Sequence, residues 1–256
     1  MSAHRNNISG IHNYCDRWCE RCCFTARCAV YESIQDQSPE EQDITNRAFW
    51  EHLSQNFKNA TQMITQAAKE HGIDICSMSQ EEMDALMEKE KETRRHVRQH
   101  PISQLSFQYL EEGKRFLEHQ HLQEEAEEAI HQVELGIKSE EEALDLILKE
   151  NDCLEVIQWY LHFIYIKFSR ALSGKIEDEG WEEAHGFQKD SDGSAKIALI
   201  AIERSMQAWA QLLTLSPCKE DGILPLLACL DKVRKLALNE FPHAPCFVRP
   251  GFDDPS

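Results

Sequence analysis

The stretch 153-CLEVIQWYLHFIYIKFSRAL-172 decides the fold, because apolar side chains recur nearly all round the helix that it would form. A second segment, 195-AKIALIAIERSMQAWAQLL-213, has the same character. Helices that are apolar on all sides lie at the centre of a bundle, so we expect these two to form the central pair of an all-α protein. Between them, residues 174–194 contain four glycines and seven acids, which predicts a long exposed loop.

Further helices follow from apolar periodicity and from capping boxes, which pair a Ser, Thr or Asp with a Glu three residues later. Apolar residues at helical spacing predict a long amphipathic helix that ends at His71 and Gly72. Ser79 with Glu82 predicts the start of another, which must end before Pro101. Other helices are expected at about 102–135, 140–150, 153–172 and 222–240, followed by an irregular tail at 241–256.

Composition limits the classes of function. The chain has 256 residues with a formal net charge of -18, and residues 1–30 carry four of its arginines. An acidic surface argues against nucleic acid as the main partner, because phosphate binding needs a basic face. The start has no apolar signal segment, and no apolar run is long enough to span a membrane. We therefore expect a cytoplasmic protein without membrane contact, whose acidic surface serves solubility, a protein partner or self-association. The sequence leaves open whether it binds a small molecule.

The segment 14-YCDRWCERCCFTARC-28 holds half of the ten cysteines of the chain. Four of them follow the spacing Cys15-x3-Cys19-x2-Cys22-x5-Cys28, and Cys23 is a spare beside Cys22. Thiolates this close repel one another unless a cation holds them, and the neighbouring arginines should lower their pKa values. In a reducing compartment such a cluster predicts a metal site. We expect residues 1–30 to form a metal-binding segment packed on a single helical domain, 31–256.

Two centres suit four cysteines in one short run. A [4Fe–4S] cluster is held by compact Cys runs, whereas structural zinc more often draws on two separated pairs. The spacing Cys-x2-Cys-x5-Cys is similar to the end of the cluster loop in endonuclease III-type DNA glycosylases, and Cys-x3-Cys-x2-Cys resembles the radical S-adenosylmethionine motif. Neither resemblance extends beyond this segment. The alternatives are therefore a [4Fe–4S] cluster, a zinc ion, or packed or redox-active thiols without a metal. If a metal is bound, Trp18 and Phe24 would shield it from solvent.

The two central segments also contain charged residues, which must pair or line a cavity if they are buried. The simpler interpretation is a structural ion-pair network. The alternative is an enzyme or a ligand-binding protein, with Glu203 or His162 as the acid or base. The candidate binding residues in that case are Glu155, Lys167, Arg170, Lys196 and Arg204.

A last pattern is Glu-x-x-His, which occurs as Glu128 with His131 and as Glu182 with His185. Ferritin-like di-iron bundles use such pairs on two of their helices. Here the first pair lies in a very polar stretch and the second in the expected loop, so solvated surface explains both more simply. The sequence therefore favours a non-catalytic scaffold or interaction module with a structural metal site.

Overall fold

The computed structural model describes residues 6–70, 72, 79–118, 130–178 and 180–254. These residues form helices and turns and no strand, which confirms the all-α prediction for the described ranges. The chain divides into two compact units: unit 1 comprises residues 1–92 and 250–256, and unit 2 comprises residues 93–249. The division falls inside a helix, whereas the sequence suggested a boundary after residue 30.

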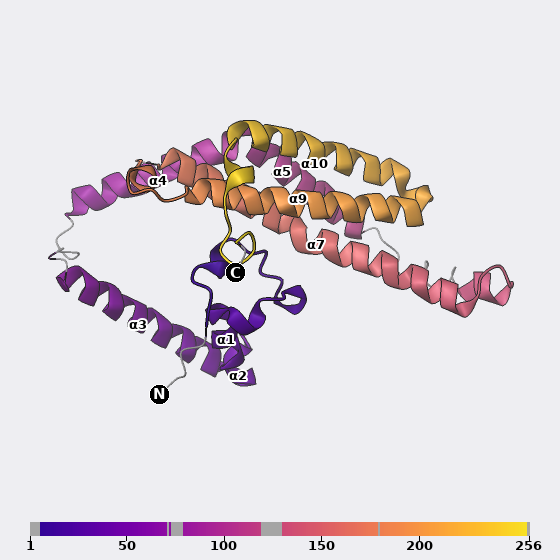
Figure 1. Cartoon of the computed structure of the whole chain (residues 1–256), viewed down its shortest axis with the longest axis horizontal. Coiled ribbons are helices and arrows are strands. Elements are labelled where there is room, and N and C mark those ends of the chain that lie inside the picture. Colours follow the sequence, from indigo (N-terminus) through magenta and orange to yellow (C-terminus); the bar gives the residue numbers. More distant parts are fainter. Residues whose placement is uncertain (1–5, 71, 73–78, 119–129, 179, 255–256) are drawn as a thin grey trace. The chain divides into compact units, whose positions relative to one another are not determined.

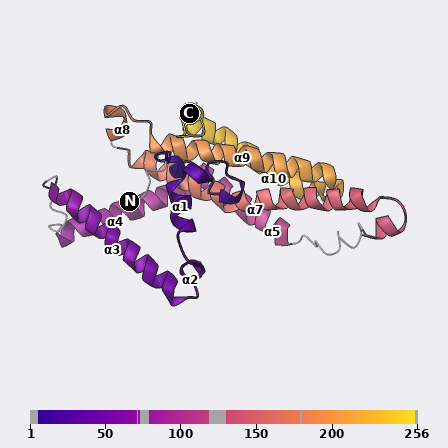
Figure 2. The ribbon, with the colours of Figure 1, turned by 60° about the horizontal axis from the view of Figure 1, so that its bottom comes forward.

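Unit 2 is a bundle of four long helices, α5 (Pro101–Glu118), α7 (Glu140–Ile176), α9 (Asp190–Leu215) and α10 (Glu220–Glu240). The interface between α7 and α9 is the most extensive, as expected for the central pair. Helices α5 and α10 pack against each other, α5 also against α7 and α10 also against α9, so the four close into a ring (Figures 1 and 2).

Large side chains fill the centre of this bundle. Trp209, Tyr109 and Phe168 are fully buried. The indole Nε1–H of Trp209 donates a 3.0 Å hydrogen bond to the hydroxyl of Tyr109, which joins α9 to α5. Gly113 lets α5 approach α7 closely, because a Cβ there would lie 2.4 Å from Leu161 Cδ2. These two contacts hold α5 against α9 and against α7.

Helix α7 differs from its prediction. The capping box at its start is present, since the amide of Glu142 donates to Ser139 Oγ at 3.2 Å and the amide of Ser139 donates to the Glu142 carboxylate at 2.9 Å. The predicted break before Cys153 is wrong, because α7 runs without interruption from Glu140 to Ile176. The break was expected because Asp152 with Glu155 has the pattern of a capping box. Cys153 and Leu154 are buried in the bundle, and this packing overrides the local cap signal.

The loop predicted at 174–194 is also shorter than expected. Helix α7 enters it as far as Ile176, α8 (Trp181–Ala184) forms a single turn within it, and α9 already begins at Asp190. Residues Ser191, Gly193 and Ser194 are buried in the first two turns of α9, so they belong to this helix and not to a loop. The helix predicted at about 102–135 is described only in part. Helix α5 ends at Glu118, and residues 119–129 lie outside the described residues.

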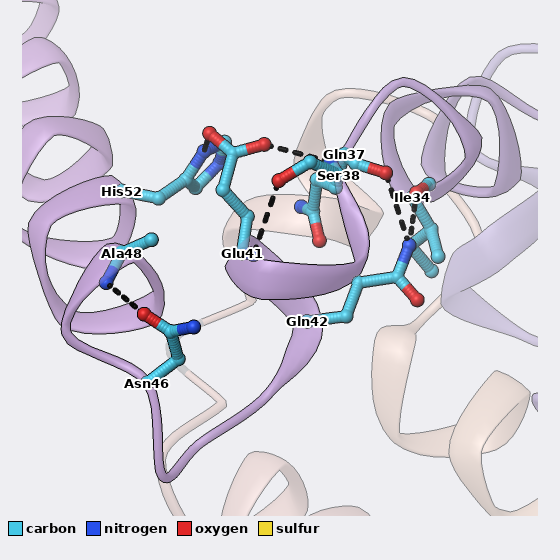
Figure 3. A network of polar contacts seen from close by, with 8 residues as sticks. All are labelled: Ile34, Gln37, Ser38, Glu41, Gln42, Asn46, Ala48 and His52. Carbon is cyan, nitrogen blue, oxygen red and sulfur yellow. Dashed lines mark hydrogen bonds and ion pairs between the residues drawn. The ribbon is translucent and has the colours of Figure 1, made fainter.

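Unit 1 contains α1 (Ala29–Gln35), α2 (Pro39–Gln42), α3 (Arg47–Glu70) and the first part of α4 (Gln80–Gln99). A polar network joins α2 to α3 (Figure 3). The carboxylate of Glu41 accepts the amide of Ser38 at 2.8 Å and lies 3.1 Å from Nδ1 of His52. The Ser38 amide, followed by His52, lowers the pKa of Glu41. The start of α3 is thus held by side chains rather than by a buried core.

Helix α3 is amphipathic as predicted, but its apolar side chains are largely exposed, including Trp50, Phe57 and Ile64. The tail after α10 is irregular, as expected. It begins with the buried Phe241, forms the short 3₁₀ turn η5 (Ala244–Cys246), and enters unit 1 at Pro250. Within the described ranges, every helix is too short or too polar to cross a lipid bilayer.

Candidate metal centre

The Cys-rich segment folds into a closed loop of short 3₁₀ turns, η1 (Ile11–Asn13), η2 (Cys19–Arg21) and η3 (Thr25–Arg27). The chain just before the loop is hydrogen-bonded to its end. The amide of Ile8 donates to the carbonyl of Arg27 at 3.0 Å, and Arg27 Nε donates to the carbonyl of Asn6 at 3.2 Å. These contacts hold residues 6–8 beside residues 27–28 and close the loop around its cysteines.

Four cysteines line one small cavity of about 20 Å³ inside this loop. They are Cys15, Cys19, Cys22 and Cys28, the same four that the spacing selects. Cys23 is exposed and does not line the cavity. Adjacent residues point in different directions, so the backbone that turns Cys22 inward turns Cys23 outward.

A strained turn brings the first two cysteines to the same cavity. Arg17 has a φ of 61°, which is the left-handed region that residues with a Cβ rarely adopt. The amide of Trp18 donates to Asp16 Oδ1 at 3.2 Å across this turn. Such conformations cost about 1–3 kcal/mol and persist where the surroundings hold them, often at functional sites. The reversal at Arg17 lets both Cys15 and Cys19 line the cavity.

Aromatic rings cover the cavity. Trp18 is buried and lines it, as does Phe24, in agreement with the shielding expected from the sequence. A third ring, Phe252, comes from the other end of the chain and was not predicted. Gly251 beside it has a φ of 76°, and a Cβ there would lie 2.8 Å from Ile8 Cδ1. The tail therefore packs directly on the residues that lead into the Cys loop.

The thiols influence one another electrostatically. Burial raises the pKa of Cys19, and the nearby thiols of Cys15, Cys22 and Cys28 raise it further. Burial also raises the pKa of Cys22. The amide of Phe24 donates to Cys22 Sγ at 3.4 Å and has the opposite, smaller effect on this pKa. The expectation that arginines lower these pKa values is wrong for both thiols.

The arginines make other contacts. The guanidinium carbon of Arg21 lies 4.1 Å from the ring centroid of Trp18, and Arg27 binds the Asn6 carbonyl as described. Arg21 thus helps to hold Trp18 in place over the cavity, and Arg27 helps to hold the two ends of the loop together.

His12 is a cavity-lining residue that the sequence analysis missed. Its Nδ1 is buried and has no hydrogen-bond partner among the described residues. Its carbonyl oxygen lies 3.6 Å from Cys15 Sγ, so the two residues are direct neighbours. The x2 spacing of His12 and Cys15 was the available signal, since ligands often occur at this separation. A buried nitrogen with no partner points to a group that would bind beside it.

The donor set suits a thiophilic metal, but the side chains are not arranged around a single ion. Among the described residues, no three His, Cys, Asp or Glu side chains are placed to hold a metal ion as they stand. Zinc would require thiolates at about 2.3 Å from the ion, so the cysteines would have to turn inward. A cubane is larger, so it would require the loop to widen. Metal binding by this loop stays a prediction.

The charged residues of the two central helices do not form the expected buried network. The two catalytic candidates, Glu203 and His162, are exposed, and so is Glu155. A bundle of four helices leaves even its central helices an outer face, where apolar residues such as Ile166 are exposed as well. The assumption that an all-round apolar sequence is buried on all sides was therefore wrong.

The other binding candidates have partners on or near that outer face. Arg204 donates to the hydroxyl of Tyr160 at 2.6 Å. The remaining three residues contact one carboxylate, one backbone carbonyl and one aromatic ring: Arg170 with Asp190, Lys196 with Phe247, and Lys167 with Phe163. These contacts tie neighbouring elements together.

The two Glu-x-x-His pairs have local roles where they are described. Glu128 lies outside the described residues, and His131 is 3.8 Å from Glu134 on an exposed turn. The carboxylate of Glu182 accepts the amide of Asp190 at 3.1 Å, and Nδ1 of His185 lies 2.8 Å from the Trp181 carbonyl.

No model of a known protein family matches this chain, and neither a curated protein nor a solved structure matches it.

Proposed function

We propose that the chain is a non-catalytic helical scaffold whose Cys loop binds one structural metal centre through Cys15, Cys19, Cys22 and Cys28. The observation that carries the proposal is their arrangement: these four cysteines line one cavity, while Cys23 is exposed and outside it. Four Cys ligands leave no open coordination position, which suits a structural role rather than catalysis.

The electrostatics of the loop support this proposal. Thiols that raise one another's pKa, as at Cys19, cannot ionise together without a compensating charge. A bound metal would supply that charge and turn mutual repulsion into ligation. The amide that donates to Cys22 Sγ would remain as a hydrogen bond to a metal-bound sulfur, which is the usual environment of such ligands.

A [4Fe–4S] cluster is our first expectation for the centre, because one compact run of cysteines is a common way to hold it. A zinc ion is the alternative that the same donor set accepts. In either case His12 lies beside the centre, and its buried Nδ1–H would be able to donate a hydrogen bond to a metal-bound sulfur. Metal binding would then supply the folding energy of a loop that has few apolar side chains of its own.

Metal analysis of anaerobically purified full-length protein tests the proposal. About four iron and four acid-labile sulfide per chain would identify the [4Fe–4S] cluster, and about one zinc per chain without sulfide would identify the alternative. A variant with serine at Cys19 and Cys28 should lose the metal. A matched variant with serine at the exposed Cys218 and Cys246 should keep it. Metal-free wild-type protein, or a metal that survives the first variant, would refute the proposal.

The contribution of His12 can be separated from that of the thiols. Replacing it by leucine removes a buried polar atom without a partner, which should leave the metal-free protein as stable or more stable. The same replacement should speed the transfer of metal from the loaded protein to a chelator. If His12→Leu changed the stability of the metal-free protein and of the metal-loaded protein by the same amount, the imidazole would have no relation to the centre.

A further inference from the structure

Unit 2 contains a second, larger cavity of about 590 Å³, in the size range of small-molecule sites. It lies where the end of α7, the start of α9 and the end of α10 meet, and includes residues of the segment between α7 and α9. It contains neither Glu203 nor His162. We infer that this cavity binds a small organic cation, a primary alkylammonium group, through Asp192 and Ser191.

The charge of the wall favours a cation. The cavity is lined by two lysines and four acids. Both lysines already have carboxylate partners: Lys175 lies 2.6 Å from Glu240, and Lys189 lies 2.7 Å from Asp178 and 3.5 Å from Glu183. The carboxylate left over is Asp192.

Three polar side chains of the wall, those of Asp192, Ser191 and His243, lack direct partners among the described residues. Neither the carboxylate of Asp192 nor the imidazole of His243 makes a hydrogen bond or an ion pair with any described residue. The same holds for the hydroxyl of Ser191, whose residue is only 6% exposed. Burial raises the pKa of Asp192, although His243 and the two lysines act in the opposite direction. Asp192 and Ser191 together offer an anionic and a neutral acceptor to a donor that carries positive charge.

The start of α9 would ordinarily attract an anion, but three of its first four amides are already bonded. The amide of Asp190 donates to Glu182 Oε1 at 3.1 Å, and the amides of Asp192 and Gly193 donate to the Lys189 carbonyl at 3.1 and 3.2 Å. An anion would therefore meet mostly bonded amides, two paired lysines and the Asp192 carboxylate. This arrangement disfavours phosphate and carboxylate ligands.

Aromatic rings complete the surroundings. Phe187 and Phe241 line the same cavity, and such rings attract ammonium groups through their faces. Phe241 already has one such contact, because Lys175 Nζ lies 5.3 Å from its ring centroid. Phe187 is exposed and stacks on Trp181 with 5.7 Å between ring centroids, so it can contact the hydrocarbon part of a ligand. An alkylammonium ion combines the charge and the apolar surface that this wall accepts.

Calorimetric titration of the full-length protein with 1,4-diaminobutane tests the inference. Asp192→Asn should weaken binding at least about tenfold, because it removes a charged hydrogen bond. Ser191→Ala should weaken binding by about two- to tenfold, as expected for a neutral hydrogen bond. Asp145→Asn is the matched control: it makes the same charge change in an exposed pair with Lys149 on α7, and should leave the affinity unchanged.

The inference fails if the wild type does not bind the diamine, or if Asp192→Asn binds it as tightly as the wild type. It also fails if inorganic phosphate or glutamate binds instead in a manner that Asp192→Asn strengthens, which would identify an anion site. Melting temperatures of each variant show whether it folds. Should Asp192→Asn not fold, an unchanged affinity of Ser191→Ala would overturn the inference.

Discussion

The ring of Phe252, four residues from the C-terminus, packs edge-on against the ring of Phe24 in the Cys loop, with 5.0 Å between their centroids and an angle of 75°. Both rings line the cavity that the four cysteines share. Phe252 thus forms part of the wall around the candidate metal centre in unit 1.

Replacing Phe252 by alanine should open this wall. The loss of the ring contact and of part of its buried surface should lower the stability of the Cys loop by roughly 1–2 kcal/mol. Hydrogen exchange should show faster exchange of the amides between residues 6 and 28, and a chelator should remove the metal faster. Phe187→Ala, at an exposed ring of unit 2, is the control and should change neither rate. Unchanged exchange in Phe252→Ala would mean that the tail does not stabilise the loop.

Gly251→Ala should disturb the same contact through the backbone. Gly251 has a φ of 76°, and the added Cβ would lie 2.8 Å from Ile8 Cδ1 and 3.0 Å from Ile11 Cδ1. Gly10→Ala is the matched control in unit 1, with a φ of 73° and its nearest contact at an ordinary 3.6 Å. Both variants lose about 1–2 kcal/mol from the left-handed backbone. Gly251→Ala should lose about 1–3 kcal/mol more through crowding, seen as weaker exchange protection of residues 6–28; equal losses would contradict this.

Cys22→Ser and Cys23→Ser should differ although the residues are adjacent. Cys22 lines the cavity and accepts the Phe24 amide on its sulfur, whereas Cys23 is exposed. Cys22→Ser should therefore lose the metal, and Cys23→Ser should retain the full amount of it. Metal content per chain, measured on both variants after identical purification, decides the matter. The reverse result would assign the ligand to Cys23 and overturn the proposed set.

The buried pair of Tyr109 and Trp209 predicts a specific loss of stability at alkaline pH. Burial raises the pKa of Tyr109 to about 12, against the lowering effect of its hydrogen bond with Trp209. An unfolded tyrosine ionises near pH 10, so the unfolded state releases its proton before the folded state does. This contribution is fully present below about pH 10 and falls by about 2 kcal/mol by about pH 12.

Tyr109→Phe provides the comparison. At neutral pH it should cost about 1–3 kcal/mol, because the buried Trp209 Nε1–H loses its acceptor. Between pH 10 and 12 the gap to the wild type should narrow, since the variant has no proton to lose at this position. Urea unfolding of both proteins at several pH values gives the gap directly. A gap that stays constant with pH would show that Tyr109 does not titrate differently in the two states.

The sequence by itself determined the local features of this protein. The central helix pair, the capping boxes at Ser79 and Ser139, and the amphipathic character of α3 follow from residues within about one helical turn of each other. The choice of Cys15, Cys19, Cys22 and Cys28 as one set also rests on short spacing, and these four do line a common cavity. Such signals are readable because the interacting groups are near neighbours along the chain.

Only the tertiary structure decided which of these features meet. The closure of the Cys loop by Gly251 and Phe252, and the buried Nδ1 of His12, depend on contacts that no local pattern encodes. The exposure of Glu203 on a helix with an apolar sequence depends on how many neighbours that helix has, and the continuity of α7 through Cys153 depends on packing that overrides a local cap. Burial is a property of packed elements, so a single helix's sequence can indicate its apolar residues but not which of them the fold will cover.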